Sequence, residues 1–146
     1  MIGGGLLLIG LQPPNFGAGE GNTVPFGIGF SVSVGRELYG EECSIEVVLE
    51  DLQGHPVQVP TPDGKGRQAL RVAQNHTFEE PTFPPGTGVP RGVLLSRVQW
   101  VLMFPGGLAL PTGAAYQWRV KIDHESRDEW TERFYVPAAR GPVVIG

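Results

Sequence analysis

Apolar and polar residues alternate with a period of two along much of this chain. The clearest segment is 26–34, FGIGFSVSV, in which every even position is phenylalanine, isoleucine or valine and every odd position is glycine or serine. Successive side chains of a β-strand point to opposite faces, so this pattern predicts a strand with one buried face. The pattern recurs at Cys43 to Leu49, Leu94 to Phe104, Tyr116 to Ile122 and Trp130 to Val136. Because no helical period of any length competes, the chain is predicted to be all-β.

Shorter segments complete this prediction. The apolar run Leu6 to Leu11 predicts a first strand, and Val57 to Val59 predicts a short return strand after a hairpin turn at residues 51–54. A second turn at residues 62–64 leads to Gln68 to Val72, which is predicted to be a weak edge strand. Each turn ends in a glycine, which can adopt the positive φ that such turns need.

The segment Leu94 to Phe104 is apolar on both faces. Val93, Leu95, Val101 and Met103 lie opposite the face that carries Trp100. We therefore expect this strand to be covered on one side by the partner sheet and on the other by a loop or a neighbouring chain. The preceding stretch 80–92 contains four prolines and is predicted to be a rigid surface loop, and the stretch 105–113 is predicted to be a turn-rich link.

About eight strands of this length predict two packed antiparallel sheets, that is, a β-sandwich of the immunoglobulin-like or a related type. A closed β-barrel is the alternative, because it also removes sheet edges. The chain has 146 residues and no internal repeat, so a single β-sandwich domain over residues 1–146 is expected. Its 22 glycines and 14 prolines fall between the apolar runs, as turn residues do.

Composition excludes several partners. A formal charge of −4 with only 11 Lys and Arg residues argues against a nucleic-acid backbone as partner. The apolar N-terminal run is too short to cross a bilayer and lacks the basic residue that precedes a secretory signal. The single cysteine, Cys43, excludes an internal disulfide and is expected to be an inert core residue. We therefore expect no nucleic-acid or membrane partner and a cytoplasmic or virion-associated location.

No catalytic arrangement is found in the sequence. Gly64-Lys65-Gly66 lacks the spacing of a phosphate-binding loop, and no serine lies in a nucleophile-elbow motif. The densest group of metal-ligating types is Asp123, His124, Glu125 and Asp128, which is either a calcium-like site or, the favoured interpretation, a charged solvated turn. We expect no catalytic residue, no metal ligand and no cofactor, and the protein is predicted not to be an enzyme.

Four segments resemble a family of uncharacterised, mostly actinobacterial proteins that share a small all-β domain of unknown function. These segments are IGGGLLLIG, VPFGIGFSVSV, IEVVLEDLQGHPV and YQWRVKIDHESRDEWTERFYV, which together cover about two thirds of the chain. Each segment is a structural pattern without chemistry. The resemblance therefore implies a fold and no activity.

The sequence favours a non-catalytic structural or interaction protein that binds a protein partner or self-assembles. A subunit or accessory of a phage or compartment shell is one concrete form, in which the C-terminal residues Val143, Val144 and Ile145 add to a partner's sheet edge. The alternative is a module that binds a small ligand or carbohydrate at the sandwich loops. In that case Trp130, Tyr39 and Phe83 are the candidate platforms.

Overall fold

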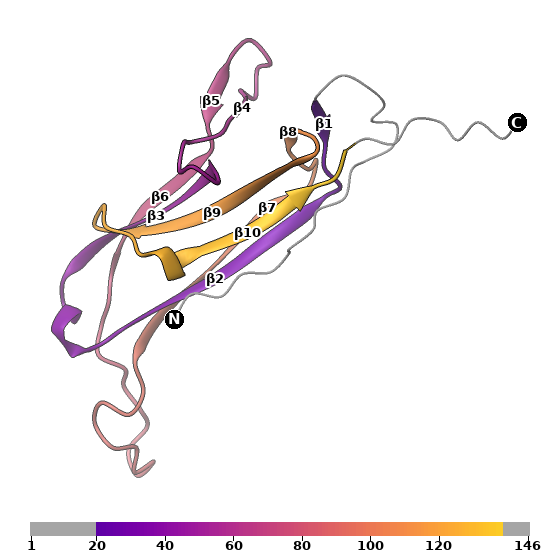
Figure 1. Ribbon diagram of the computed structural model, residues 1–146. Helices are drawn as coiled ribbons and strands as arrows, with labels where there is room; N and C mark the ends of the chain where they lie inside the picture. Colours follow the sequence, from indigo (N-terminus) through magenta and orange to yellow (C-terminus); the bar gives the residue numbers. More distant parts are fainter. Residues whose placement is uncertain (1–19, 139–146) are drawn as a thin grey trace, which may run out of the picture.

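The computed structural model describes residues 20–138, and all regular structure in this range is strand except for two short 3-10 helices (Figure 1). No helix in the described range is long and apolar enough to span a membrane. The predicted strand Leu6 to Leu11 and the predicted arm Val143 to Ile145 lie outside the described residues. In chain order the elements are β1 Glu20–Asn22, β2 Phe26–Val34, η1 Arg36–Leu38, β3 Glu42–Asp51, β4 Gln58–Pro60, β5 Arg67–Ala69, β6 Arg71–Thr77, β7 Ser96–Phe104, β8 Ala109–Pro111, β9 Ala114–Ile122, η2 Asp128–Trp130 and β10 Thr131–Val136.

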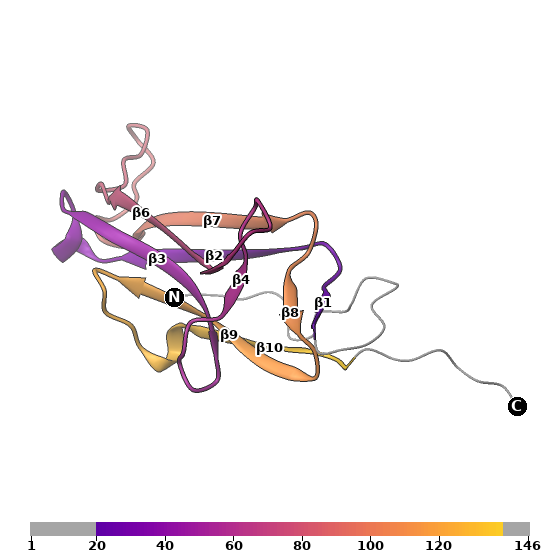
Figure 2. The same ribbon diagram turned by 90° about the horizontal axis from the view of Figure 1, so that it is seen from above.

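The strands form two packed layers. One layer is a four-stranded antiparallel sheet in the order β10-β9-β3-β6, and the other is the antiparallel pair β2-β7. Figure 2 shows β3 and β6 crossing β2 and β7, with the small pairs β1-β8 and β4-β5 toward the same end. The predicted β-sandwich is confirmed. The alternative barrel is wrong for the described strands, because both β10 and β6 are open edges of their sheet.

Aromatic contacts join the two layers. Between the layers, the ring of Phe104 on β7 stacks on Trp118 of β9 at 5.7 Å between centroids. Within the β2-β7 layer, Phe30 meets its cross-strand partner Trp100 edge-on at 5.2 Å. These side chains belong to one buried cluster, which also holds the inward residues Cys43, Ile45, Val47 and Leu49 of β3. The period-two pattern therefore identified the core faces of β2, β3 and β9 correctly.

Two predicted turns and the final hairpin are also confirmed. Gly54 and Gly64 have φ values of +88° and +72°, and each donates its N–H to the carbonyl three residues earlier. β9 pairs with β10 from Thr131 opposite Arg119 to Val136 opposite Ala114. The sequence therefore predicted the pairs that consecutive strands form through short turns.

The sequence did not predict strand pairs whose residues show no alternation of apolar and polar side chains. β1 and β8 are three-residue strands, and β8 lies inside the stretch 105–113 that was predicted to be a link. The edge strand predicted at 68–72 extends to Thr77 and changes partner at Leu70, whose N–H donates to Val57 while its carbonyl accepts from Leu49. These short strands are set by backbone hydrogen bonds rather than by a buried face, so periodicity cannot reveal them.

The outward face of β3 is buried rather than exposed to solvent. Alternation about the inward residues of β3 places Glu46 and Glu50 on the solvent side, but both are buried, because Arg71 pairs with Glu46 and Arg119 pairs with Glu50. Val48, between them, is buried on the same face. A carboxylate on the outer face of a central strand is thus hidden when a cross-strand arginine lies over it.

The second face of β7 is not covered within the chain. Val101 and Met103 are 69% and 66% exposed, although a loop or a neighbouring chain was expected over them. Their cross-strand partners are Gly29 and Gly27 of β2, which offer no side chain to pack against. The expected loop cover is therefore wrong for the described residues, and cover by a neighbouring chain stays a prediction.

Candidate interaction site

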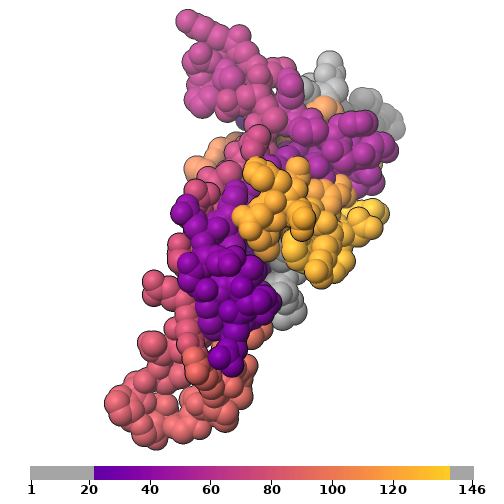
Figure 3. Space-filling view, turned by 90° about the vertical axis from the view of Figure 1, so that its left-hand side faces the viewer, coloured from indigo at the N-terminus to yellow at the C-terminus, as the bar shows by residue number. Residues whose placement is uncertain are grey.

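The segment that joins β6 to β7 projects from one end of the sandwich. Figure 1 shows it descending beyond η1, and Figure 3 shows it as a salmon lobe at that end, opposite the tip of the β4-β5 ribbon. Its four prolines keep it out of the sheets, as predicted. Two internal turns give it shape, with the N–H of Thr87 donating to Pro84 and that of Val93 donating to Pro90.

Both ends of this loop are fixed. At its start, Phe78 is fully buried and its carbonyl accepts a 2.8 Å hydrogen bond from the N–H of Gly40. Further along, Arg91 donates from Nε and Nη2 to the two carboxylate oxygens of Glu80 at 2.8 and 3.2 Å. This hydrogen bonding holds the pKa of Glu80 below its usual value, and the positive charges of Arg91 and Arg36 act in the same direction. The loop is thus closed upon itself by a bidentate ion pair.

A small cavity of about 170 Å³ lies between the loop and η1. Tyr39 and Phe83, both singled out from the sequence, line the same cavity. The Tyr39 hydroxyl also accepts a hydrogen bond from the N–H of Ser96, which ties the end of η1 to the start of β7. The lining residues are Tyr39, Glu80, Pro81, Phe83, Val89, Arg91, Gly92 and Leu94.

Large apolar side chains of the loop are exposed, and two of them, Phe83 and Leu94, line this cavity. Phe83, Val93, Leu94 and Leu95, which we call the loop patch, are between 40% and 60% exposed. Leu94 was predicted to share the buried face of β7, but β7 begins only at Ser96, so Leu94 belongs to the loop. The sequence identified Phe83 as a candidate and missed the other three, because a run of apolar residues before a strand looks like part of that strand.

Carboxylates lie at the same end of the molecule as the loop patch. Gly40 and Phe78 are hydrogen-bonded, so the residues next to them, Glu41 and Glu79, are brought to the same end, and Glu42 pairs with Thr77 in the β3-β6 register. With Glu37 and Glu80 these form a group of five carboxylates that we call the acidic rim. Arg36 and Arg91 are the basic residues of η1 and the loop, and Arg91 is already paired with Glu80. This end of the molecule is therefore acidic.

The remaining candidate residues lie elsewhere. Trp130, in η2, is half-buried against the core, and the guanidinium of Arg127 lies 5.3 Å from its ring centroid. It does not line the cavity that Tyr39 and Phe83 share, so the three predicted platforms do not form one surface. Val143, Val144 and Ile145 lie outside the described residues.

The charged turn after β9 has a structural role. Asp123 and His124 both have positive φ, at 49° and 67°, and form the two-residue turn closed by hydrogen bonds between Ile122 and Glu125. The Asp123 carboxylate accepts a 2.8 Å hydrogen bond from the N–H of Ser44. No group of three potential metal ligands is found in residues 20–138.

Cys43 is a core residue, with 1% of its surface exposed. Burial raises the pKa of its thiol, and the negative charges of Asp123 and Glu41 raise it further. A thiol that stays protonated and buried is chemically inert. Comparison of the chain with protein-family models, curated proteins and solved structures gives no match.

Proposed function

We propose that this protein is a non-catalytic β-sandwich that binds another protein through the loop patch. The observation that carries this proposal is the exposure of four large apolar side chains on a fixed, protruding loop, two of which, Phe83 and Leu94, line one cavity. Contiguous apolar surface on a folded chain is a mark of an interaction site. Because the loop is closed by the Glu80–Arg91 ion pair before any partner arrives, binding costs less ordering entropy than a flexible loop requires.

The acidic rim specifies the partner further. A contacting segment with an apolar side chain for the cavity and flanking Lys or Arg residues matches both the loop patch and its surroundings. Complementary charge of this kind speeds association and rejects acidic partners. Exposed charges are screened by salt, so binding is expected to weaken as ionic strength rises. An accessory subunit of a larger assembly, such as a phage or compartment shell, is the concrete form that we propose.

A comparison of two surfaces tests this function. The double variant Leu94→Ser/Leu95→Ser removes half of the loop patch, while the matched variant Val101→Ser/Met103→Ser removes similarly exposed apolar residues from the outer face of β7. We expect proteins that co-purify with the wild type from its own cells, measured by quantitative mass spectrometry, to persist with the second variant and to be lost with the first. The reverse pattern would place the contact on β7 and contradict the proposal.

Self-association is measured separately. We expect the purified chain to show the mass of one copy in size-exclusion chromatography with light scattering, since its rim repels a second acidic rim. A dimer that dissociates in the Leu94→Ser/Leu95→Ser variant would show that a second copy, rather than a basic partner, occupies the loop patch.

A further inference from the structure

A second cavity, of about 280 Å³, lies on the outer face of the four-stranded sheet. The turn at residues 51–54 borders it on one side and η2 on the other, and its floor comes from β9 and β10. It shares no residue with the loop patch or its cavity, so a ligand bound here is independent of the proposed function. The lining residues are Leu52, Gln53, Gly54, Gln117, Arg119, Asp128, Thr131 and Arg133.

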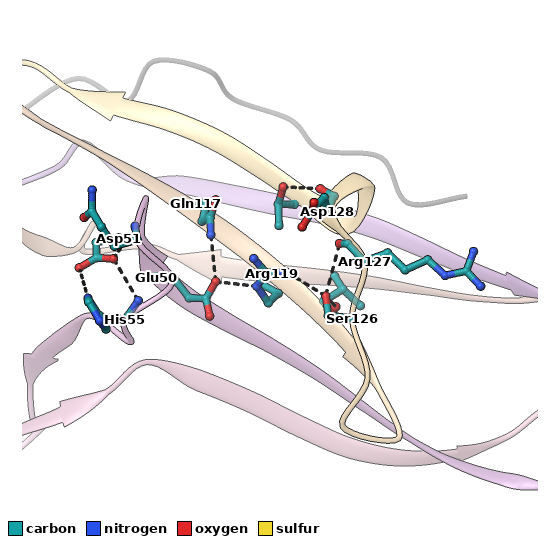
Figure 4. Close-up of polar contacts among 11 residues, drawn as sticks. Glu50, Asp51, His55, Gln117, Arg119, Ser126, Arg127 and Asp128 are labelled. Atoms are coloured by element: carbon teal, nitrogen blue, oxygen red, sulfur yellow. Dashed lines mark hydrogen bonds and ion pairs between the residues drawn. The ribbon is translucent and has the colours of Figure 1, made fainter.

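The floor of this cavity is held by a buried hydrogen-bond network. Glu50 and Gln117 are each only 4% exposed, and the Gln117 side-chain amide donates to Glu50 Oε1 at 3.0 Å. Arg119 donates from Nε to the same oxygen at 2.7 Å and from Nη1 to Ser126 Oγ at 3.2 Å. Figure 4 shows this chain of contacts running from Gln117 through Glu50 and Arg119 to Ser126. Two fixed bonds orient the Arg119 guanidinium and leave its Nη2 free of the network.

A second guanidinium lies beside the first. Arg133 is directly opposite Gln117 in the β9-β10 register, and Arg119 is two residues along β9 on the same face. Diagonal neighbours of this kind are about 7–8 Å apart, so one carboxylate can contact both guanidinium groups. Arg133 forms no ion pair or side-chain hydrogen bond with any residue in the described part of the chain. Its donors are therefore available to a ligand.

Acceptors line the same cavity. The Asp128 carboxylate has no side-chain partner within residues 20–138, since it is the backbone carbonyl of Asp128 that accepts from Thr131 Oγ1. The amide oxygen of Gln117 is likewise uncommitted among the described residues, because only its NH₂ group is used. The charge of Arg119 is already matched by Glu50. Two charged groups, the Arg133 cation and the Asp128 anion, are left for a ligand.

We infer that this cavity binds a small zwitterion, a molecule with a carboxylate and an ammonium group such as an amino acid or a dipeptide. The carboxylate contacts Arg133 and Arg119, and the ammonium group contacts Asp128 and the amide oxygen of Gln117. A simple anion would place a third negative charge beside Asp128 and Glu50, whereas a zwitterion satisfies both unmatched groups. The volume is just below the ~300 Å³ at which pockets for drug-sized ligands begin, which suits a ligand of this size.

An NMR titration tests the inference. The probes are a mixture of the common amino acids together with glycylglycine as zwitterions, sodium succinate as a carboxylate alone, ethylamine as an ammonium alone and glucose as a neutral polyol. We expect a zwitterion to shift the Gln117 side-chain amide and the Arg119 Nε–H signals. Succinate and ethylamine are expected to bind at least about tenfold more weakly, because each leaves one charged hydrogen bond unmade.

Variants identify the contacts. Arg133→Gln and Asp128→Asn are each expected to weaken zwitterion binding about tenfold or more, and neither breaks a side-chain hydrogen bond or ion pair within the described residues. Arg97→Gln, an exposed arginine on β7, and Glu125→Gln, an exposed carboxylate in the β9 turn, are the matched controls and should bind like the wild type. Equal binding of succinate, a preference for glucose, or no shift with any probe would each overturn the inference.

Discussion

Gly107 lies against the main-chain carbonyl of Thr23. A Cβ atom at position 107 would be 2.0 Å from that oxygen, and the backbone φ there is +69°. Thr23 is fully buried and forms two hydrogen bonds with Leu108, the residue after Gly107. Its N–H donates to the Leu108 carbonyl, and its Oγ1 accepts from the Leu108 N–H. This contact between two backbones closes the end of the sandwich where β1 pairs with β8.

Replacing this glycine is therefore expected to be costly. Gly107→Ala should lower the free energy of unfolding by about 3 kcal/mol or more, because positive-φ strain adds to a clash with backbone that cannot move aside. Gly86→Ala is the control, since Gly86 also has positive φ, at +85°, but has no neighbour within 4 Å of its Cβ position. In urea denaturation, Gly86→Ala should lower the free energy of unfolding by only about 1–2 kcal/mol. Equal losses would show that the contact with Thr23 is unimportant.

The buried and exposed ion pairs should differ in the same assay. Arg119→Met leaves Glu50 buried without its charged partner, and we expect unfolding to become easier by about 3–5 kcal/mol. Adding Glu50→Gln should restore part of this loss, because the stranded charge is removed. Arg91→Met breaks the solvent-exposed pair with Glu80 and should leave the unfolding free energy nearly unchanged. A failure of Glu50→Gln to rescue would argue that packing of Arg119, not charge, supports the sheet.

Trp118 carries an indole N–H that is buried without a hydrogen-bond partner among the described residues. Its ring stacks on Phe104 and on Phe134 at centroid distances of 5.7 and 6.0 Å. Trp118→Phe keeps an aromatic ring and removes the unpaired donor, so we expect the free energy of unfolding to fall by less than about 1.5 kcal/mol. Trp118→Ala leaves a cavity and should cost about 3–5 kcal/mol. A large loss for phenylalanine in thermal or urea unfolding would mean that the N–H has a partner in solution.

The buried thiol of Cys43 is expected to make the folded protein less stable at alkaline pH. Because the pKa of its thiol is raised in the folded state, the unfolded chain loses this proton first as pH increases. The stabilising contribution is present below the ordinary thiol pKa of 9.0 and is lost as pH rises from there through the folded-state value. Cys43→Ala should therefore flatten the fall in stability above pH 9.0, measured by urea denaturation at successive pH values. An unchanged alkaline slope would contradict this assignment.

Reactivity gives an independent check on the same residue. The thiol should resist alkylation by iodoacetamide in the native protein and react at once in denaturant, since the reaction needs an accessible cysteine thiolate to attack the reagent. Rapid alkylation of the folded chain would show that Cys43 is not held in the core.

The sequence predicted the sandwich because its strands each bury one face. Where side chains alternate strictly, as in β2 with Phe30 and Val32, burial follows directly from position. Alternation says nothing about what lies over the other face, and so it could not predict that Arg119 covers Glu50 or that Met103 stays exposed. Those outcomes depend on which strands become neighbours, and neighbours are set by long-range pairing.

The candidate site was predictable only in part. Tyr39 and Phe83 were chosen because they are aromatic residues in loops, and the structure places both at one cavity. The zwitterion cavity carried no sequence signal, because Gln117 and Arg133 are 16 residues apart and meet only through the β9-β10 register. Spacing along the chain reveals sites on one element, not sites built from two strands and a turn.

Site-directed photocrosslinking tests the central claim most directly. A photoreactive phenylalanine analogue at position 94 in the loop patch should form a covalent adduct with a partner protein in the cells that make this chain. The same analogue at position 101, on the outer face of β7, is the control. We expect an adduct at 94, crosslinked through a segment rich in Lys or Arg and weakened by added salt. An adduct at 101 and none at 94 would contradict the claim that the loop patch is the binding surface.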